Sequence, residues 1–343
     1  MPPHTALPIA TTAPSRAWRL CVAPMMDWTD RHCRYFHRLI APRARLYTEM
    51  ITTGALLHGD VPRHLDFDPA EHPLALQVGG SEPADLAHCA RLAQQWGYDE
   101  INLNCGCPSP RVQRGAFGAC LMAEPALVRD CVEAMRDAAA LPVTVKHRIG
   151  IDRVDDYGFV RDFVGTVGEG GCTVFIVHAR NAWLDGLSPK RNREVPPLRH
   201  DTVARLKCDF PQWIFVLNGG LGESLELRAE LARVDGVMIG RAAYHDPWRL
   251  REWEAIAFGP AIEAEPTRDE VEQAMVRYMT EQHASHATPW LAVARHMMGL
   301  RLGEPGARRW RQVWSDHALR ALAPAEVMQR ARAAMTRGEP QSV

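Results

Sequence analysis

The chain alternates short apolar runs of strand-like composition with amphipathic stretches of helical period. The stretches between the runs include Pro83–Trp96, Pro125–Ala140 and Ser224–Ala232. Eight strands that alternate with helices indicate an all-parallel sheet, and their number matches the α/β fold known as the (β/α)8 TIM barrel. The eight runs are Leu20–Pro24, Arg45–Thr48, Leu74–Val78, Glu100–Asn104, Val143–Lys146, Val174–His178, Ile214–Asn218 and Gly236–Gly240.

The alternation stops after Pro247-Trp248, and the rest of the chain has a helical pattern. The segment Phe258–Pro266 contains two prolines and two glutamates, which is typical of a linker. The sequence therefore predicts a disordered N-terminal tail at 1–17, a TIM barrel at 18–257 and a small C-terminal helical domain at 267–343. We expect the helices of this last domain at Ala274–Ala284, at Trp290–Leu302, in the basic stretch 307–314 and from Pro324 to Arg337.

Composition excludes some classes of protein. The chain has 343 residues, of which 46% are hydrophobic and 24% charged, as in an ordinary globular protein. Its nine cysteines form no disulfide framework, and residues 1–17 lack the apolar run of a secretory signal. No stretch reaches the ~18 apolar residues of a membrane span. We therefore expect reduced thiols, a cytoplasmic location and no membrane contact, and we infer no obligate protein partner.

Polar side chains stand at the ends of several apolar runs. Gln77, Asn104, Lys146 and His178 each close or nearly close one run. Active sites of TIM barrels lie at the C-terminal ends of the strands, so this set of side chains predicts a functional site there.

The segment Asn102–Pro108 reads NLNCGCP and places two thiols where a strand breaks off into a Gly/Pro turn. A thiol at this place can exchange a proton with a bound ligand, because the strand end fixes its position while the loop leaves it accessible. From this pattern alone, a catalytic thiol and an inert thiol are equally compatible with the sequence. Cys105 and Cys107 lack the second cysteine pair or the histidine partners that tetrahedral zinc needs, and we expect no metal.

Two strand ends favour a phosphate. Asn218-Gly219-Gly220 and Gly240-Arg241 close the seventh and eighth runs, where TIM barrels commonly bind phosphate. Glycines let the backbone approach an anion, and the guanidinium of Arg241 can contact it with two donors.

The net charge of -1 hides a basic C-terminal end. From Leu291 to Val343 there are nine Arg against four Asp/Glu, a local charge of +5. Scattered arginines usually form a solvated surface, although a nucleic-acid interface has the same pattern. Trp310 and Trp314 among these arginines could stack on bases or form the core of a helix.

The chain contains the motifs 23–30 (APMMDWTD), 47–50 (YTEM), 76–80 (LQVGG), 102–109 (NLNCGCPS) and 218–220 (NGG). Together these motifs resemble those of the flavin-dependent tRNA-dihydrouridine synthases, and the resemblance runs from about Trp18 to about Arg311. Further stretches resemble the A subfamily in particular: 31–36 (RHCRYF), 186–190 (GLSPK), 192–194 (NRE) and 295–300 (RHMMGL).

The resemblance implies a TIM barrel that carries FMN and a helical domain that binds tRNA. Cys107 would be the general acid, and Asn104 and Arg148 would touch the target uracil. By the same resemblance, the residues that contact FMN would be Pro24, Met25, Met26, Gln77, Lys146, His178, Asn218, Gly219, Gly220, Gly240 and Arg241. The expected tRNA contacts are Lys190, Arg193, Arg295, Arg301, Arg308 and Arg311.

The implied reaction reduces the C5–C6 bond of uridines in the tRNA D-loop, at positions 20 and 20a. Reduced FMN would supply a hydride to C6, Cys107 would supply a proton to C5, and NADPH would reduce the flavin again. Alternatives are an FMN-dependent reductase of a free pyrimidine, and a tRNA-binding chaperone with a vestigial flavin site.

Four positions depart from the pattern of the family. Cys105 replaces an apolar residue, and we expect it to face the core rather than act as a second acid. His147 replaces a small polar residue and could tune the site or face the barrel wall. Asn181 and Arg191, in the loop after the sixth run, leave the finer tRNA contacts open.

Overall fold

A computed structural model of the chain describes residues 16–154, 156–261 and 265–336. The predicted tail therefore lies almost entirely outside the described residues. All strands pair in parallel in one sheet. The strands are β1 (Leu20–Val22), β2 (Leu46–Tyr47), β3 (Ile51–Thr52), β4 (Leu74–Gly79), β5 (Glu100–Cys105), β6 (Val143–Arg148), β7 (Val174–His178), β8 (Ile214–Asn218) and β9 (Gly236–Ile239).

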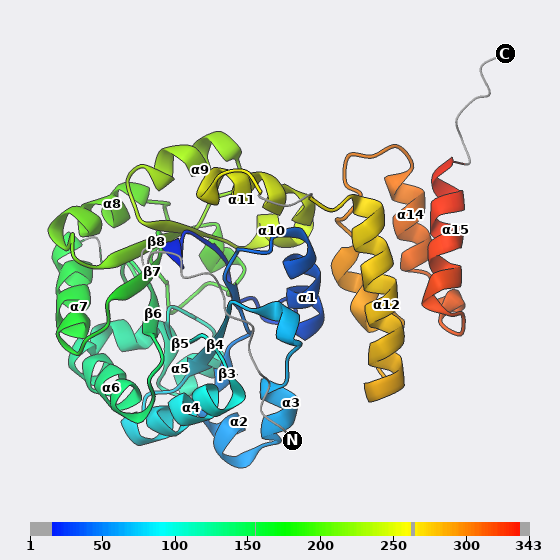
Figure 1. The fold of residues 1–343 in the computed structure, drawn as a ribbon. Coiled ribbons are helices and arrows are strands. Elements are labelled where there is room, and N and C mark those ends of the chain that lie inside the picture. The colour runs from blue at the N-terminus through cyan, green and yellow to red at the C-terminus, as the bar shows by residue number, and fades with distance from the viewer. Residues whose placement is uncertain (1–15, 155, 262–264, 337–343) are drawn as a thin grey trace.

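The sheet closes into a TIM barrel, which confirms the predicted fold (Figure 1). The strand order is β1-β9-β8-β7-β6-β5-β4-β2. The ring closes between β1 and β2, because the Val22 amide donates to the Arg45 carbonyl and the Arg45 amide to the Leu20 carbonyl, each at 2.9 Å. All eight predicted runs contain a barrel strand. The short β3 was not predicted, and it pairs only with the end of β4.

Helices surround the strands as an outer layer (Figure 1). The prediction for α4 (Pro83–Trp96) is correct at both ends. Proline suits the first helical turn, and Gly97 ends the helix with a φ of 85° that glycine tolerates. The other barrel helices are α1 (Arg31–Ile40), α2 (Thr53–His58), α3 (Val61–Leu65), α5 (Pro110–Arg114), α6 (Pro125–Ala138), α7 (Tyr157–Glu169), α8 (His200–Asp209), α9 (Ser224–Leu231), α10 (Arg241–His245) and α11 (Leu250–Phe258).

Strand residues alternate between two environments, as the pleat requires. On β5, Ile101, Leu103 and Cys105 face the helices and belong to the large core cluster between strands and helices. The barrel interior is lined by the alternate positions. One part of it is apolar, with Val174, Ile176, Val216 and Met238 in a separate cluster. The part lined by β4, β5 and β6 is polar.

The C-terminal helices form a bundle beside the barrel (Figure 1). The domain boundary predicted between 257 and 267 falls between α11 and α12, in a segment of which 262–264 lie outside the described residues. The predicted helix Trp290–Leu302 is wrong beyond Met297. There Gly299 packs so closely against the barrel that a Cβ atom would lie 2.5 Å from the His245 carbonyl oxygen. The helices are α12 (Arg268–His286), α13 (Trp290–Ala294), the 3-10 turn η6 (Arg295–Met297), α14 (Ala307–Trp314) and α15 (Pro324–Thr336).

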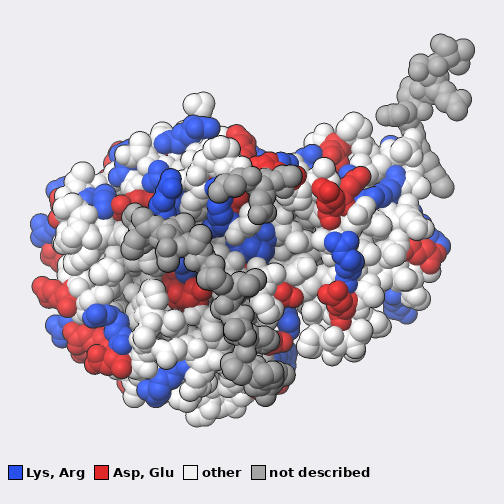
Figure 2. Space-filling model, viewed as in Figure 1, with Lys and Arg blue, Asp and Glu red and all other residues white. Residues whose placement is uncertain are grey.

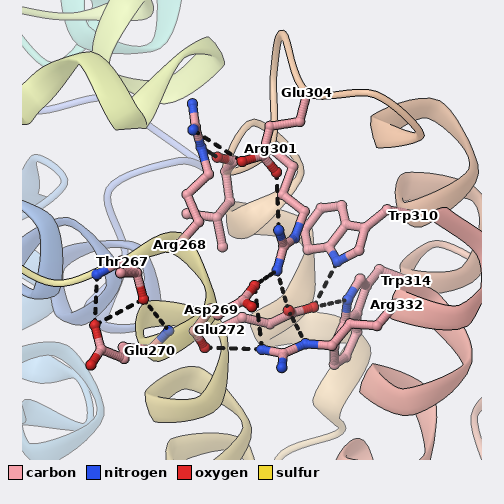
Figure 3. A network of polar contacts seen from close by, with 11 residues as sticks. Thr267, Arg268, Asp269, Glu270, Glu272, Arg301, Glu304, Trp310, Trp314 and Arg332 are labelled. Atoms are coloured by element: carbon pink, nitrogen blue, oxygen red, sulfur yellow. Dashed lines mark hydrogen bonds and ion pairs between the residues drawn. The ribbon is translucent and has the colours of Figure 1, made fainter. Parts of the chain in front are cut away.

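A buried carboxylate organises this bundle (Figure 3). Glu272 of α12 is fully buried, and its Oε1 accepts hydrogen bonds from the indoles of Trp310 (2.6 Å) and Trp314 (3.0 Å). Its Oε2 accepts from the guanidiniums of Arg301 (2.8 Å) and Arg332 (2.9 Å). Both tryptophans are fully buried, so of the two readings that the sequence allowed, the helix core is correct and base stacking is not.

The bundle contacts the barrel through α1. Asp30, which caps α1, accepts from the guanidinium of Arg295 (2.6 Å) and lies 3.0 Å from Nε2 of His296. Next to it, Tyr35 stacks on Tyr278 of α12 with ring centroids 4.0 Å apart. Within the described residues, no helix has both the length and the apolar character needed to cross a membrane.

Candidate active site

The C-terminal end of β5 carries the thiol loop. Oδ1 of Asn104 accepts from the backbone amides of Gly106 (3.1 Å) and Cys107 (2.9 Å), which fixes the start of the loop. Cys107 is partly exposed, and its Sγ lies 3.6 Å from the hydroxyl of Ser109. Nε2 of Gln113 donates to the carbonyls of Pro108 (2.9 Å) and Leu184 (2.8 Å) and so ties this loop to the loop after β7. The thiol is therefore accessible and held in place.

Cys105 differs from Cys107 in every respect that matters for proton transfer. Its side chain is fully buried in the core between strands and helices, and burial raises its pKa well above the ordinary value. The expectation that Cys105 faces the core is confirmed. Only Cys107 of the two thiols can reach a ligand.

Gln77 and Asn104 meet inside the barrel mouth. Nδ2 of Asn104 donates to Oε1 of Gln77 over 2.9 Å, and both side chains are buried. Gln77 lies opposite Asn102, and Asn104 lies opposite Lys146, in the register of the sheet. The structure thus brings together two residues that the sequence assigned separately to flavin and uracil.

Lys146 occupies an interior position of β6. Thr144, two residues earlier, bonds to Asn102 inside the barrel, so Lys146 lies on the same face of the strand. Burial, and secondly Arg148, lowers the pKa of Lys146 to about 7. Its ammonium makes no ion pair with a described residue. A partly buried cation without a counter-charge among the described residues is suited to stabilise an anion in the site.

His147 and Arg148 have different environments. His147 is fully buried against Phe163 of α7 and Phe175, so it faces the barrel wall rather than the site. Arg148 is on the site side, but it donates to three backbone carbonyls, those of Gly106 (3.1 Å), Asn181 (3.2 Å) and Asn192 (2.9 Å). It therefore organises the loops after β5 and β7 in addition to any contact with a ligand.

The segments that follow β7 and β9 carry a cluster of cations. Partial desolvation, and secondly Arg241, lowers the pKa of both Arg180 and Arg193. Glu194 pairs with Arg241 at 2.7 Å. The predicted Arg241 and Arg193 thus lie near each other, and Arg180 is an addition that sequence analysis missed. Its position two residues after His178, the predicted strand end, was the available signal.

Glycine is required in the turn after β8. Gly219 has a φ of +108° and Gly220 a φ of +75°. A Cβ atom at Gly219 would lie 2.6 Å from the ring of His178, and one at Gly220 would lie 2.4 Å from Leu198. Burial, and secondly Arg148, lowers the pKa of His178 well below its ordinary value, so this imidazole is neutral beside the turn. Nδ2 of Asn218 donates to the Met238 carbonyl at 2.8 Å and joins β8 to β9.

The segment after β1 lies at the same end of the barrel. Pro24 and Met25 are partly exposed, and Met26 is 56% exposed, which is unusual for so large an apolar side chain. A Cβ atom at Gly240 would lie 3.7 Å from Sδ of Met25, so this segment borders the end of β9. An exposed methionine at the mouth of a polar site provides an apolar surface for a flat ligand.

The predicted tRNA contacts differ in their exposure and in their ion pairs. Lys190 and Arg193 are exposed in the loop after β7, and Arg308 and Arg311 are on one face of α14 without ion pairs to described residues. Arg295 is half-exposed beside Asp30. Arg301 is different, because it is buried and pairs with Asp269, Glu272 and Glu304. This environment favours a structural role for Arg301 over tRNA contact.

The surface of the helical bundle carries both signs of charge (Figure 2). Asp269 and Glu272 of α12 lie outside the stretch counted from Leu291 and pair with Arg301 and Arg332, so part of the excess of arginine in that stretch is neutralised locally. The net positive charge that the bundle offers to a polyanion is therefore smaller than the charge of +5 counted from Leu291 to Val343.

Within the described part of the chain, no group of three or more His, Cys, Asp or Glu is arranged to hold a metal ion. The donor set fits a phosphorylated flavin better. Arg180 and Arg193 are close enough for Arg241 to lower their pKa, and the buried Nε of Arg180 has no hydrogen-bond partner. An excess of cations with an orphaned donor suits a phosphate group.

Comparison with known proteins agrees with this geometry. The family model described as "Dihydrouridine synthase (Dus)" matches residues 21–336. The chain is 54% identical over 331 residues to the "tRNA-dihydrouridine(20/20a) synthase" of Pseudomonas putida, covering 96% of this chain and 97% of that protein. Proteins of the same name from Xanthomonas campestris pv. campestris (56% over 313 residues; 91% and 92% covered) and Salmonella typhimurium (52% over 317 residues; 92% and 94% covered) are also similar.

Proposed function

The chain belongs to the dihydrouridine synthase family, and we propose that it reduces uridines 20 and 20a of tRNA to 5,6-dihydrouridine. The observation that carries the proposal is the position of Cys107. A partly exposed thiol is held by Asn104 at the end of a barrel strand, and it opens to the same barrel mouth as Lys146 and the arginines around Arg241. This arrangement supplies a proton donor and binds an anionic cofactor in one site.

The proposed cofactor is FMN, and the reductant that regenerates it is NADPH. When bound, FMN supplies the hydride that adds to C6 of the uracil. The residues that would hold the flavin are Pro24, Met25 and Met26 on its apolar surface, Gln77 at its pyrimidine edge and Lys146 near its electron-rich side. The phosphate would lie among His178, Asn218, Gly219, Gly220, Gly240 and Arg241, with Arg180 added by the structure.

Cys107 would give its proton to C5 of the uracil. A thiol suits this step because it is a weak acid that carries a transferable proton. Asn104 and Arg148 would orient the base, and Arg148 would also keep the thiol loop in contact with the loop after β7 through its three carbonyl acceptors. The uridine must leave the stacked tRNA to reach the barrel mouth.

The proposed tRNA contacts are Lys190 and Arg193 at the barrel mouth, and Arg308 and Arg311 on α14. Arg295 can contribute its exposed edge, while Arg301 is left out because three carboxylates hold its guanidinium. Cations on two separate parts of the chain favour a ligand larger than a free pyrimidine. The docking of the whole tRNA would therefore choose which uridine enters the site.

The test separates the two half-reactions. In Cys107→Ala, NADPH should still bleach the bound flavin, while formation of dihydrouridine should fall by roughly 10²–10⁴, the typical effect of a general acid. The matched control is Cys208→Ala, which removes an exposed thiol. Cys105→Ala should leave the chemistry nearly unchanged.

Equal loss in Cys107→Ala and Cys105→Ala would show that the wrong thiol is assigned. Turnover of free uracil at a rate comparable to that of tRNA would favour a reductase of free pyrimidines. Binding of tRNA by a protein that takes up no flavin would favour a chaperone. Product mapped to positions 16 or 17 would reject the assigned uridines and leave the reaction intact.

A further inference from the structure

A continuous chain of side-chain hydrogen bonds runs through the barrel interior to the thiol loop. It begins at Glu100, where the Thr144 hydroxyl donates to Oε1 of the carboxylate at 2.5 Å. Oγ1 of Thr144 accepts from Nδ2 of Asn102 at 2.7 Å, and Oδ1 of Asn102 accepts from Nε2 of Gln77 at 2.7 Å. Gln77 then leads through Asn104 to the amides of Gly106 and Cys107. Every side chain in this ladder is buried.

The donor and acceptor at each link are fixed from the loop end. A backbone N–H can only donate, so the two amides that face Oδ1 of Asn104 identify this atom as the oxygen. Nδ2 of Asn104 must then donate to Gln77, whose oxygen faces it. Nε2 of Gln77 must in turn donate to Asn102. The amide orientations therefore follow from the network rather than from a choice between equivalent atoms.

The ladder is fixed from the other end as well. Glu100 is fully buried and accepts from the indole of Trp18 (2.7 Å) and from the hydroxyls of Tyr47 (2.9 Å) and Thr144. The guanidinium of Arg45 forms an ion pair with it at 3.2 Å. A carboxylate can only accept hydrogen bonds, so the Thr144 hydroxyl must donate to Glu100. The lone pairs of the hydroxyl oxygen are then left to accept from Nδ2 of Asn102. The loop end and the Glu100 end thus require the same direction of donation at every hydrogen bond. Thr144 is the one group of the ladder that could donate in either direction without the carboxylate.

We propose that Glu100, Thr144 and Asn102 are positioning residues that fix Gln77 and Asn104 as hydrogen-bond donors toward the ligands of the active site. Each of these two amides uses one N–H within the ladder and has a second N–H left. This N–H can meet only an acceptor, such as a carbonyl oxygen of the flavin pyrimidine ring or of uracil. The exocyclic amino group of cytosine could not accept it. The inference rests on the proposed function and adds residues that touch neither ligand.

The test uses Thr144→Val, which keeps the shape of the side chain but removes the hydroxyl. Nδ2 of Asn102 then loses its acceptor, and the orientation of Asn102 and Gln77 is imposed from the loop end alone, with a buried N–H of Asn102 left without a partner. Titration of the flavin-free protein with FMN, followed by quenching of flavin fluorescence, should give a Kd about tenfold or more above wild type, the equivalent of one lost hydrogen bond. The absorption bands of the bound flavin should shift, and Thr144→Ser should restore both.

Ile176→Val provides a control of similar structural cost. Ile176 is fully buried in the apolar part of the same interior, and its shortening should lower stability modestly without touching the ladder. Its FMN Kd and flavin spectrum should equal those of wild type. If Thr144→Val is not obtained folded, Glu100→Gln tests the other end. An amide there can also donate to Thr144, so the bias is weakened and the FMN Kd should rise a few-fold.

An unchanged Kd and spectrum in Thr144→Val, or in Glu100→Gln where only that variant folds, would overturn the inference while wild type still binds FMN and makes dihydrouridine. A loss in Thr144→Val that Thr144→Ser does not restore would also overturn it, because the hydroxyl would then not be the cause. If wild type itself binds no FMN, the proposed function fails before the ladder is tested.

Discussion

Removal of the Glu272 carboxylate should strongly destabilise the helical bundle and leave the barrel nearly unaffected. The fully buried carboxylate accepts from two indoles and two guanidiniums (Figure 3). In Glu272→Ala the two buried indole N–H groups lose their acceptor, at about 1–3 kcal/mol each. Arg301 keeps Asp269 and Glu304, and Arg332 is 30% exposed, so the guanidiniums are partly compensated.

These terms place the expected loss of unfolding free energy at about 3–5 kcal/mol, the usual cost of breaking a buried pair. A domain has only about 5–15 kcal/mol in total, so this loss is a large fraction. Glu272→Gln should cost less, because its oxygen can still accept from the indoles. The control is Glu326→Ala, which breaks an exposed i,i+4 pair with Arg330 and should cost about 0.5 kcal/mol or less.

Urea unfolding followed by tryptophan fluorescence and far-UV circular dichroism measures these changes. The bundle transition should move to lower urea in Glu272→Ala while FMN binding by the barrel stays near that of wild type. A loss no larger than that of Glu326→Ala would refute the reasoning, because the buried network would then contribute nothing beyond a surface pair.

Two further predictions concern the tRNA contacts and Lys146. The double substitution Arg308→Glu and Arg311→Glu should raise KM for tRNA and flatten its dependence on salt, because fewer counterions are released, while NADPH oxidation continues. An unchanged salt slope relative to wild type would show that this face of α14 is only solvated. The control is the double substitution Arg129→Glu and Arg161→Glu on barrel helices α6 and α7. The pKa of Lys146 is lowered to about 7 in the folded protein, whereas its ordinary value is 10.5. Between these two pH values the unfolded chain binds more protons than the folded protein, so this group makes the free energy of unfolding rise with pH. Lys146→Met should reduce this rise in the flavin-free protein, measured by urea unfolding at pH 7 and pH 9, and an identical pH dependence in both proteins would contradict the lowered pKa.

The strands were predictable because burial on both faces of a parallel barrel leaves short, strongly apolar runs bounded by turns. Helix α4 was predictable to the residue because Pro83 and Gly97 mark its two ends. The short β3 gave no such signal, since Ile51–Thr52 is a two-residue strand that exists only by pairing with the end of β4. Its structure depends on a neighbour that is distant in the sequence.

The arginines show what a charge count leaves out. Arg301 and Arg308 are seven residues apart in the same basic stretch, and the family resemblance implied tRNA contact for both. The structure surrounds Arg301 with three carboxylates, two of them from α12, whereas Arg308 is exposed on α14. Only the folded bundle decides which guanidinium is free, because the partners come from other helices.

The hydrogen-bond ladder, by contrast, was predictable from the sequence, because polar and apolar residues alternate on β5. Strand β5 reads Glu-Ile-Asn-Leu-Asn-Cys, with apolar and polar residues in strict alternation. In an antiparallel sheet this pattern indicates one face in water. In a closed parallel barrel both faces are buried, so Glu100, Asn102 and Asn104 must find partners inside, and buried polar groups in native proteins are almost always satisfied. A polar alternation on a barrel strand therefore predicts an internal network, and at the C-terminal end of the strand such a network leads directly to the active site.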